Sequence, residues 1–249
     1  NWSIFQSALV SKGATTYSYP SSANSGIEEK LSFLGEKNQI NHFNENLDQI
    51  ANNIMVSRYG PQWEKVGQDI DGEGAGDRSG YSVSISADGS VLAIGAYSNS
   101  TSTGHVRVYE YGKNEDGNYG WHKKGEDIDG ETFFEYFGTS VSLNADGSMV
   151  AIGAPFNDSI TGNNFDQRGH VRVFEYREYK AEDDDDKIVM TEDTGIAAID
   201  GELYWIQVGQ DIDGEAESDN SGWSVSLCAD GTVLAIGADL NNGINNLEH

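Results

Sequence analysis

The sequence predicts an all-β protein built from about three blade-like, four-stranded repeats, the last incomplete, after a partly helical N-terminal segment. Two observations lead to this prediction. Three stretches of the chain superpose without a gap when they are aligned on tryptophan, and each contains runs of alternating or continuous apolar residues that are typical of strands. The three superposable stretches are residues 63–96, 121–154 and 205–238.

Each repeat is predicted to contain four strands, which in the first copy are residues 63–70, 81–86, 90–96 and 105–111. In the second of these strands, large side chains alternate with serines, a pattern that favours sheets stacked closely on their neighbours. The third strand, VLAIGA, is apolar throughout, as expected of a strand buried on both faces. The fourth reads GHVRVYEY, returns as GHVRVFEY at residues 169–176, and is missing from the third copy.

An Asp-Gly pair separates the second and third predicted strands of every copy. This pair favours a two-residue hairpin turn in which both central residues have positive φ. We therefore interpret Asp88, Asp146 and Asp230 as turn residues rather than as ligands. The tryptophans Trp63, Trp121 and Trp205 are interpreted as core aromatics, because they occupy the same position in each copy.

The repeats define the predicted domain organisation. The N-terminal segment 1–60 does not follow the repeat; Phe43, Leu47, Ile50 and Ile54 are spaced for one helical face. Within it, GATTYSY at residues 13–19 is similar to the fourth strand, and we interpret it as a strand that could complete the third copy. The remaining boundaries are 61–111 for repeat 1, 121–176 for repeat 2, 177–204 for an acidic insertion between repeats, 205–246 for the incomplete repeat 3, and 247–249 for a remnant of a vector-encoded tag.

The composition is strongly acidic, with 41 acidic against 15 basic residues and a formal net charge of −26. Nucleic acid is a poor partner for such a chain, because binding it requires Lys and Arg against the phosphates. Cations and cationic polymers are better matched. No run of residues reaches the length of a membrane-spanning helix. The single Cys228 excludes an internal disulfide framework and is interpreted as a surface substitution for Ser86 and Asn144 of the other copies.

A repeated acidic stretch, GQDIDGE or GEDIDGE, follows the tryptophan strand of each copy, and a fourth carboxylate comes four residues later. Two interpretations stay open. Calcium requires several oxygen ligands from a loop that can curl around it. A structural corner would use the same residues, because Asp caps loop amides and Gly permits a sharp bend. The candidate calcium ligands are Asp69, Asp71, Glu73, Asp77, Asp127, Asp129, Glu131, Glu135, Asp211, Asp213, Glu215 and Asp219.

The repeat resembles the FG-GAP repeat, the blade of the integrin α-type β-propeller. Phe137-Gly138 opens the alternating strand of the second copy, and Gly153-Ala154-Pro155 closes the next strand. The resemblance covers residues 63–246. It implies an extracellular propeller, a role in adhesion and support by calcium. It also implies more blades than this chain contains, so that open blade faces could associate with one another. One departure is clear: the family's calcium loop lies between the FG and GAP strands, where this chain has only Asp-Gly.

These observations favour an extracellular, cell-surface or lumenal binding and adhesion module that recognises a protein or glycan, with calcium as a candidate cofactor. Sequons at Asn1, Asn99 and Asn157 are compatible with a glycoprotein. The alternative is an acidic matrix or biomineral-associated protein that assembles with polycations. An enzyme is the less favoured second alternative, because no phosphate loop, zinc pair or nucleophile elbow occurs. The repeated His105 and His170 are interpreted as packing residues.

Overall fold

The computed structural model describes residues 63–98, 102–114, 116–158, 166–180 and 198–241, together with the backbone of two strands at residues 5–10 and 13–18. These residues form strands, turns and loops, and none of them is helical. The predicted all-β class is therefore confirmed for the described part of the chain. The helical face predicted around Phe43 lies outside the described residues. Within the described residues, no helix has the length and apolarity needed to cross a membrane.

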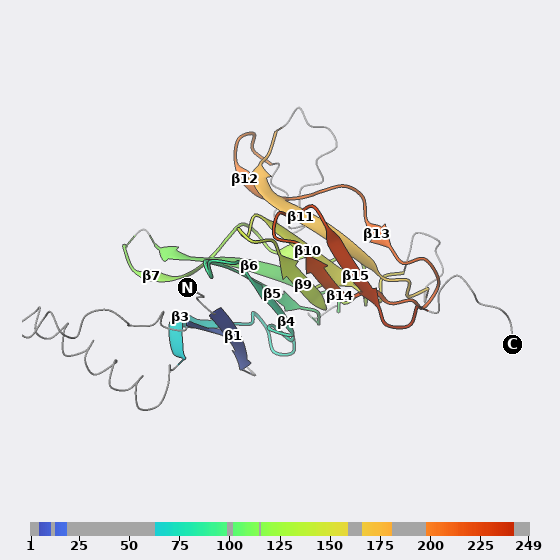
Figure 1. The fold of residues 1–249 in the computed structure, drawn as a ribbon, viewed down its shortest axis with the longest axis horizontal. Helices are drawn as coiled ribbons and strands as arrows, with labels where there is room; N and C mark the ends of the chain where they lie inside the picture. The colour runs from blue at the N-terminus through green and yellow to red at the C-terminus, as the bar shows by residue number, and fades with distance from the viewer. Residues whose placement is uncertain are drawn as a thin grey trace, which may run out of the picture. The chain divides into compact units, whose positions relative to one another are not determined.

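Two five-stranded antiparallel sheets form the centre of the larger compact unit, which comprises Leu9–Thr15 and Gly67–His249. The first sheet has the order β4-β5-β6-β7, and the second has the order β9-β10-β11-β12 (Figure 1). In addition, β8 pairs with β6 and β13 pairs with β11. The strands of the first sheet are β4 (Ser82–Ile85), β5 (Val91–Ala96), β6 (His105–Lys113), β7 (Tyr119–Lys123) and β8 (Ile128–Asp129). The strands of the second sheet are β9 (Ser140–Leu143), β10 (Met149–Ala154), β11 (His170–Glu178), β12 (Leu203–Gln207) and β13 (Ile212–Asp213).

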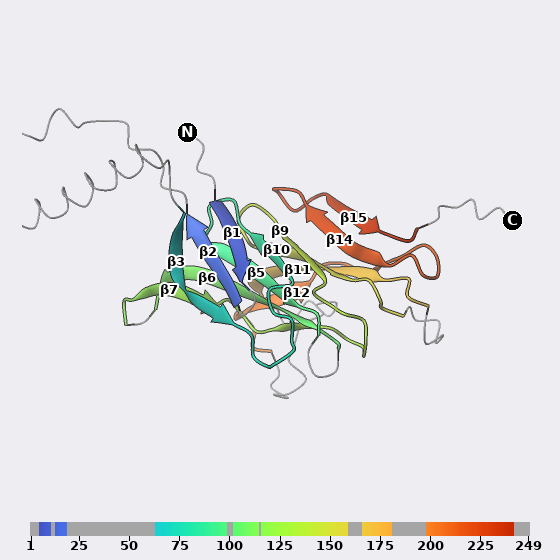
Figure 2. The same cartoon turned by 90° about the horizontal axis from the view of Figure 1, so that it is seen from below.

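Two smaller sheets accompany them. A hairpin of β14 (Ser221–Leu227) and β15 (Leu234–Ala238) comes from the third copy, and β1 (Phe5–Val10), β2 (Gly13–Ser18) and β3 (Glu64–Asp71) form a three-stranded sheet in that order (Figure 2). The predicted strand at residues 13–19 therefore exists, but it pairs with β3 and does not complete the third copy. It occupies the same place beside a tryptophan strand that β6 and β11 occupy in their sheets.

The sheets are offset from the sequence repeat by one strand. Tyr111 of β6 is paired with Trp121 of β7, and Tyr176 of β11 is paired with Trp205 of β12, so the tryptophan strand of each copy completes the sheet of the copy before it. This pairing is favoured because the two strands are consecutive in the chain and form an antiparallel hairpin. The predicted insertion 177–204 connects β11 of the second copy with β12 of the third, and residues 181–197 lie outside the described part of the chain. Next to these strands, the Tyr179 N–H donates to the Glu202 carbonyl at 2.8 Å.

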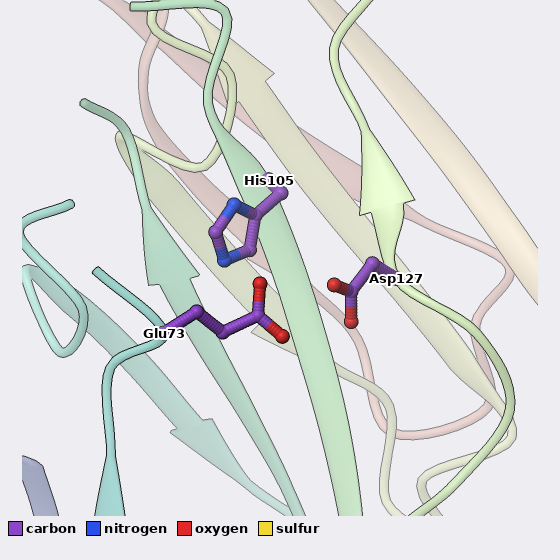
Figure 3. Close-up of side chains that lie close together, drawn as sticks. All are labelled: Glu73, His105 and Asp127. Atoms are coloured by element: carbon purple, nitrogen blue, oxygen red, sulfur yellow. The ribbon is translucent and has the colours of Figure 1, made fainter. Parts of the chain in front are cut away.

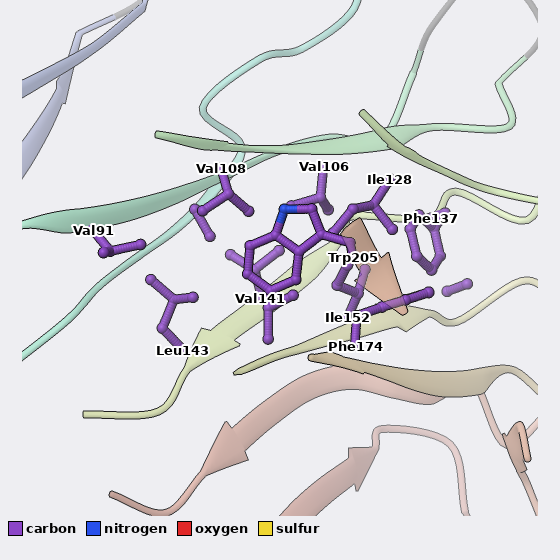
Figure 4. Close-up of a cluster of buried hydrophobic side chains, with 13 residues drawn as sticks. Val91, Val106, Val108, Ile128, Phe137, Val141, Leu143, Ile152, Phe174 and Trp205 are labelled. Atoms are coloured by element: carbon purple, nitrogen blue, oxygen red, sulfur yellow. The ribbon is translucent and has the colours of Figure 1, made fainter. Parts of the chain in front are cut away.

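The main hydrophobic core contains 13 residues from the two five-stranded sheets and their connections (Figure 4). Phe137 and Phe174 meet edge to face with ring centroids 6.3 Å apart, and both are fully buried. Trp205 belongs to this core, and Trp121 belongs to a second cluster with Ile70, as predicted for these two tryptophans. The prediction is wrong for Trp63, which is 40% exposed. Trp121 and Trp205 pack on Gly67 and Gly125 of the preceding copy, whereas no such glycine lies before Trp63 among the described residues.

Successive sheets contact each other through serines and glycines, as the alternating pattern predicts. Ser84 Oγ of β4 accepts the Leu143 N–H of β9 at 2.9 Å, and Ser142 Oγ of β9 accepts the Leu227 N–H of β14 at 2.9 Å. Gly95 lies so close to the next sheet that a Cβ on it would come within 2.1 Å of the Gly138 carbonyl oxygen. Small residues on this face therefore allow one sheet to approach the backbone of the next.

The Asp-Gly turns differ from the predicted type. Only the glycines of the three turns have positive φ, and the Ser86 N–H donates to Val91 O, which leaves a loop of four residues rather than two. The aspartates cap these loops: Asp88 Oδ1 accepts the Ser90 N–H at 2.9 Å and the Ser86 hydroxyl at 2.7 Å. These hydrogen bonds hold the pKa of Asp88 below its ordinary value. The interpretation of the aspartates as turn residues thus agrees with the structure.

Cys228 takes the place of a hydroxyl in the third of these turns. Its Sγ accepts the Val233 N–H at 3.0 Å and donates to Asp230 Oδ1 at 2.8 Å. Ser86 makes both of the corresponding bonds in the first turn. The thiol is therefore part of the turn, and with the other hydrogen bonds it lowers the pKa of Asp230 to about 2.

Candidate metal site at the acidic corners

The fourth carboxylate of each acidic corner caps the corner's own backbone. Asp77 Oδ2 accepts the Gly74 N–H at 2.6 Å, and Asp219 Oδ2 accepts the Ala216 N–H at 2.8 Å. Glu135 has one more methylene and reaches one residue further, to the Glu131 N–H at 2.5 Å. These side chains are therefore used as caps, which is the role that the structural interpretation assigned to the corner acids.

Left-handed backbone flanks each capping residue. The residue after it has positive φ in all three corners, although none of the three is glycine: φ is 60° at Arg78, 56° at Tyr136 and 56° at Asn220. Such values are uncommon outside glycine, asparagine and aspartate. The capping hydrogen bond stabilises this left-handed backbone, which explains a carboxylate at this position.

An arginine from the fourth strand holds two of the corners from the other side. Arg107 donates to the Asp71 carbonyl at 3.1 Å and pairs with Glu73 at 3.5 Å. Arg172 makes the same contacts more closely, with Asp129 O at 3.0 Å and with Glu131 Oε1 at 2.9 Å. The third copy has no such strand among the described residues. There, the Arg168 guanidinium donates a hydrogen bond to the Glu215 backbone carbonyl at 3.2 Å.

The predicted ligands of one corner do not converge. Among the described residues, no three of the twelve candidate carboxylates from a single corner bring their oxygens within 4.8 Å of one another. Asp69, Asp71, Asp213 and Glu215 are exposed, whereas Asp77, Glu135 and Asp219 are turned towards the corner backbone. Calcium prefers six to eight oxygens, so a calcium ion at a single corner would need ligands other than three converging side-chain carboxylates.

A different cluster forms between consecutive corners. Glu73 from the first corner, Asp127 from the second and His105 at the start of β6 place one ligand atom each within 4.8 Å of the others. Figure 3 shows the His105 ring beside the Glu73 carboxylate, with Asp127 on the far side of that carboxylate. His105 is 4% exposed, and its Nε2 has no hydrogen-bond partner in the described part of the chain. The sequence interpretation assigned this imidazole to packing, and the structure places it beside two carboxylates.

The equivalent histidine of the second copy is arranged differently. His170 Nε2 lies 4.0 Å from Glu135 Oε2, and its Nδ1 lies 3.9 Å from Asp211 Oδ2. The two carboxylates thus face opposite nitrogens of the ring, so they do not converge on one ligand position. Glu131, which corresponds to Glu73, is engaged by Arg172.

Burial shifts the pKa values of several groups here. Desolvation raises the pKa of Asp129, and the nearby Asp127 charge raises it further. Desolvation also raises the pKa of Glu135, against the opposing effect of Arg172. Desolvation and the Arg172 charge lower the pKa of His170 to about 4, so this imidazole is neutral at physiological pH.

The Asn157 sequon is closed to glycosylation in this structure. Asn157 is buried, and its Nδ2, the atom that would carry a glycan, donates to Glu135 Oε2 at 2.6 Å. Attachment at this atom would remove the bond and force the side chain out. The sequons at Asn1 and Asn99 lie outside the described residues.

A row of aromatic side chains crosses the three copies. Successive ring centroids are 4.5, 5.4, 5.2 and 6.1 Å apart, and every contact is edge to face. Tyr81 and Trp223 at the ends are 54% and 41% exposed. We call this set the aromatic row; its members are Tyr81, Tyr97, Tyr136, Phe156 and Trp223.

Comparison with known proteins adds no relative to these observations: the chain matches no family model and no curated protein.

Proposed function

We propose that the chain is a propeller-type binding module of the FG-GAP kind, which acts outside the cell or in the secretory lumen and recognises a protein partner. The observation that carries the proposal is the aromatic row. Tyrosine and tryptophan dominate the energetics of protein interfaces because they bury large, rigid surfaces. A continuous, partly exposed series of such rings is therefore the strongest candidate for a contact surface among the described residues.

The row is not a by-product of the repeat. Residues that build the repeated sheets recur at equivalent positions, as the serines and corner carboxylates do. The aromatic row uses different positions in different copies: Tyr81 and Trp223 are equivalent, but the corresponding residue of the second copy is Thr139. That copy instead contributes Tyr136 and Phe156. Rings that meet in space without sharing a repeat position support a role in recognition rather than in sheet packing.

The exposed corner next to the row adds to this surface. Phe133 and Phe134 are 71% and 65% exposed, and Phe134 has a φ of 66°, which is unfavourable for a bulky residue. With a net charge of −26, the chain is matched to a partner whose surface is basic.

The propeller-type arrangement is supported by the repeated contact between sheets. Serines of β4 bond to the backbone of β9, and serines of β9 bond to the backbone of β14. The equivalent Ser224 and Ser226 of β14 are exposed, so the third sheet presents the same kind of face without a described neighbour. A further sheet that contacts β14 through these serines would extend the series of stacked sheets.

The test is binding of the full chain to a panel of purified, basic extracellular-matrix proteins immobilised for interferometry. Replacement of both end residues, Tyr81→Ala with Trp223→Ala, is expected to weaken binding by at least about 30-fold, because interface aromatics contribute 2 kcal/mol or more. Tyr119→Ala is the matched control: Tyr119 is 66% exposed but lies outside the row. Equal loss in the control, or full binding by the double variant, would contradict the proposal.

A further inference from the structure

We propose that Glu73, His105 and Asp127 form a binding site for a divalent transition metal ion such as zinc, placed between two consecutive acidic corners. The three ligand atoms lie within 4.8 Å of one another. They come from the loop after β3, the start of β6 and the loop before β8, so residues far apart in sequence lie close together (Figure 3). The site differs from a calcium corner, because it takes residues from two corners and includes a nitrogen ligand.

The buried imidazole is the second observation that points to a ligand. His105 is 4% exposed, and no described group bonds to its Nε2. A buried polar atom without a partner is costly, and such an atom requires a specific explanation. A metal ion between His105 and the two carboxylates would satisfy it.

The donor set selects the kind of ion. One imidazole nitrogen with two carboxylate oxygens is a combination typical of zinc and of other borderline first-row metals. Calcium prefers oxygen ligands only, and in larger number. A fourth position would remain for water, as in zinc sites with three protein ligands.

The site has room to close on an ion. Zinc binds nitrogen and oxygen ligands at about 2.0–2.2 Å. The three ligand atoms, which here lie within 4.8 Å of one another, would therefore move closer together around a bound ion. His105 is fixed in β6 by its pairing with Asp129 of β8. The Glu73 side chain is 56% exposed and contacts Arg107 only at 3.5 Å, so it can move the remaining distance.

A lysine competes for the site. Lys123 Nζ pairs with Asp127 Oδ1 at 2.8 Å, and the Lys123 side chain is 36% exposed. An ion that binds Asp127 must share this carboxylate with the ammonium or displace it. Removing the lysine charge should therefore strengthen metal binding.

The second copy provides a matched control within the same chain. His170 is equally buried and its Nε2 likewise has no hydrogen-bond partner among the described residues. The difference lies in the carboxylates, because those of the second copy face opposite ring nitrogens and Glu131 is held by Arg172 at 2.9 Å. Among the described residues, such a cluster therefore forms between the first and second corners and not around His170.

The experiment is calorimetric titration of the chelator-treated full chain with zinc chloride and, in parallel, with calcium chloride. All proteins carry His249→Ala, so that a C-terminal histidine cannot contribute. One zinc ion per chain is expected. Glu73→Gln and Asp127→Asn should each weaken binding by at least about tenfold, since even outer-shell changes cost 10- to 100-fold. Lys123→Met should tighten it, and Glu131→Gln and His170→Asn should leave it unchanged.

Three results would overturn the site: no zinc binding, zinc binding that survives both carboxylate variants, or binding of calcium alone. Glu73 is exposed, so Glu73→Gln is expected to fold normally; circular dichroism of each variant establishes this before titration. Loss of zinc binding in Glu131→Gln or His170→Asn as well would also count against the proposal, because it would place the ion elsewhere.

Discussion

At the scale of single residues, the acidic corners assign different tasks to identical side chains. The fourth carboxylate caps the corner backbone, and the third pairs with an arginine in two of the copies. In the first copy that third carboxylate also lies in the cluster with His105. The sequence shows only that carboxylates recur at these positions. It does not show the direction of each side chain, which depends on the strands packed against the corner.

Stability at acid pH should depend on His170. Its folded-state pKa is about 4, below the ordinary value of 6.5, because burial and Arg172 disfavour the imidazolium. The unfolded chain therefore binds a proton that the folded chain does not, so stability is lost as the pH falls from about 6.5 towards 4. The raised pKa of Glu135 acts in the opposite sense, because the folded state then takes up a proton more readily.

The measurement is urea unfolding of wild type and His170→Asn between pH 7.5 and 4. The variant removes the titrating group, so its stability should fall less steeply across this range, whatever the other carboxylates contribute to both proteins. Parallel curves for the two proteins would show that His170 does not contribute.

At the scale of strands and sheets, the contact between neighbouring sheets depends on glycine. Gly95→Ala should destabilise the protein by about 3 kcal/mol, because the new Cβ would come within 2.1 Å of the Gly138 carbonyl oxygen and backbone would have to move. Gly112→Ala is the matched control: it lies in the adjacent strand β6, has no positive φ, and nothing lies within 4 Å of its Cβ position.

Chemical denaturation of the two variants checks this prediction. The control should change the free energy of unfolding by less than about 0.5 kcal/mol, as is usual for surface substitutions. Similar losses in both variants would mean that strand propensity, rather than contact between sheets, accounts for the effect.

The sequence was sufficient to locate the strands but not to predict which strands pair with one another in a sheet. Alternation and the apolar run located β4, β5 and β6 correctly, since these patterns depend on which faces are buried. The tryptophan strand was assigned to the sheet of its own copy, because a repeat read from sequence has no marked beginning. The Asp-Gly turn was predicted two residues too short, because the side-chain caps of Asp88 and Ser86 favour a longer loop.

The candidate sites were harder to predict for a related reason. Equivalent histidines suggested equivalent packing, but Glu73 and Glu131 differ in how tightly an arginine holds them. The aromatic row was not predicted, because its members occupy unmatched positions and an alignment of repeats separates them. A comparison of the copies for their differences would have been the useful signal.

At the scale of the whole molecule, the charge of −26 remains the basis of the alternative function, assembly with polycations. If this attraction is distributed over the surface, binding to polylysine should weaken by more than about tenfold as ionic strength rises from about 0.01 M to 1 M, because the Debye length falls from about 30 Å to 3 Å. Light scattering and calorimetry across this salt range measure it. Binding that is unchanged by salt would exclude the alternative.

Because the sheets are offset from the sequence copies by one strand, the boundary between two copies lies inside a sheet. Each tryptophan strand ends one sheet and leads into the next, so a cut between two tryptophans passes through equivalent strands. Excising residues 63–120 and joining the chain to Trp121 would replace β3 by its counterpart β7 and leave the sheet of β9 to β13 with its outer strand β12. Gene duplication or deletion in units of one copy could therefore lengthen or shorten the array without exposing a broken edge, with each crossover located inside a sheet rather than between sheets.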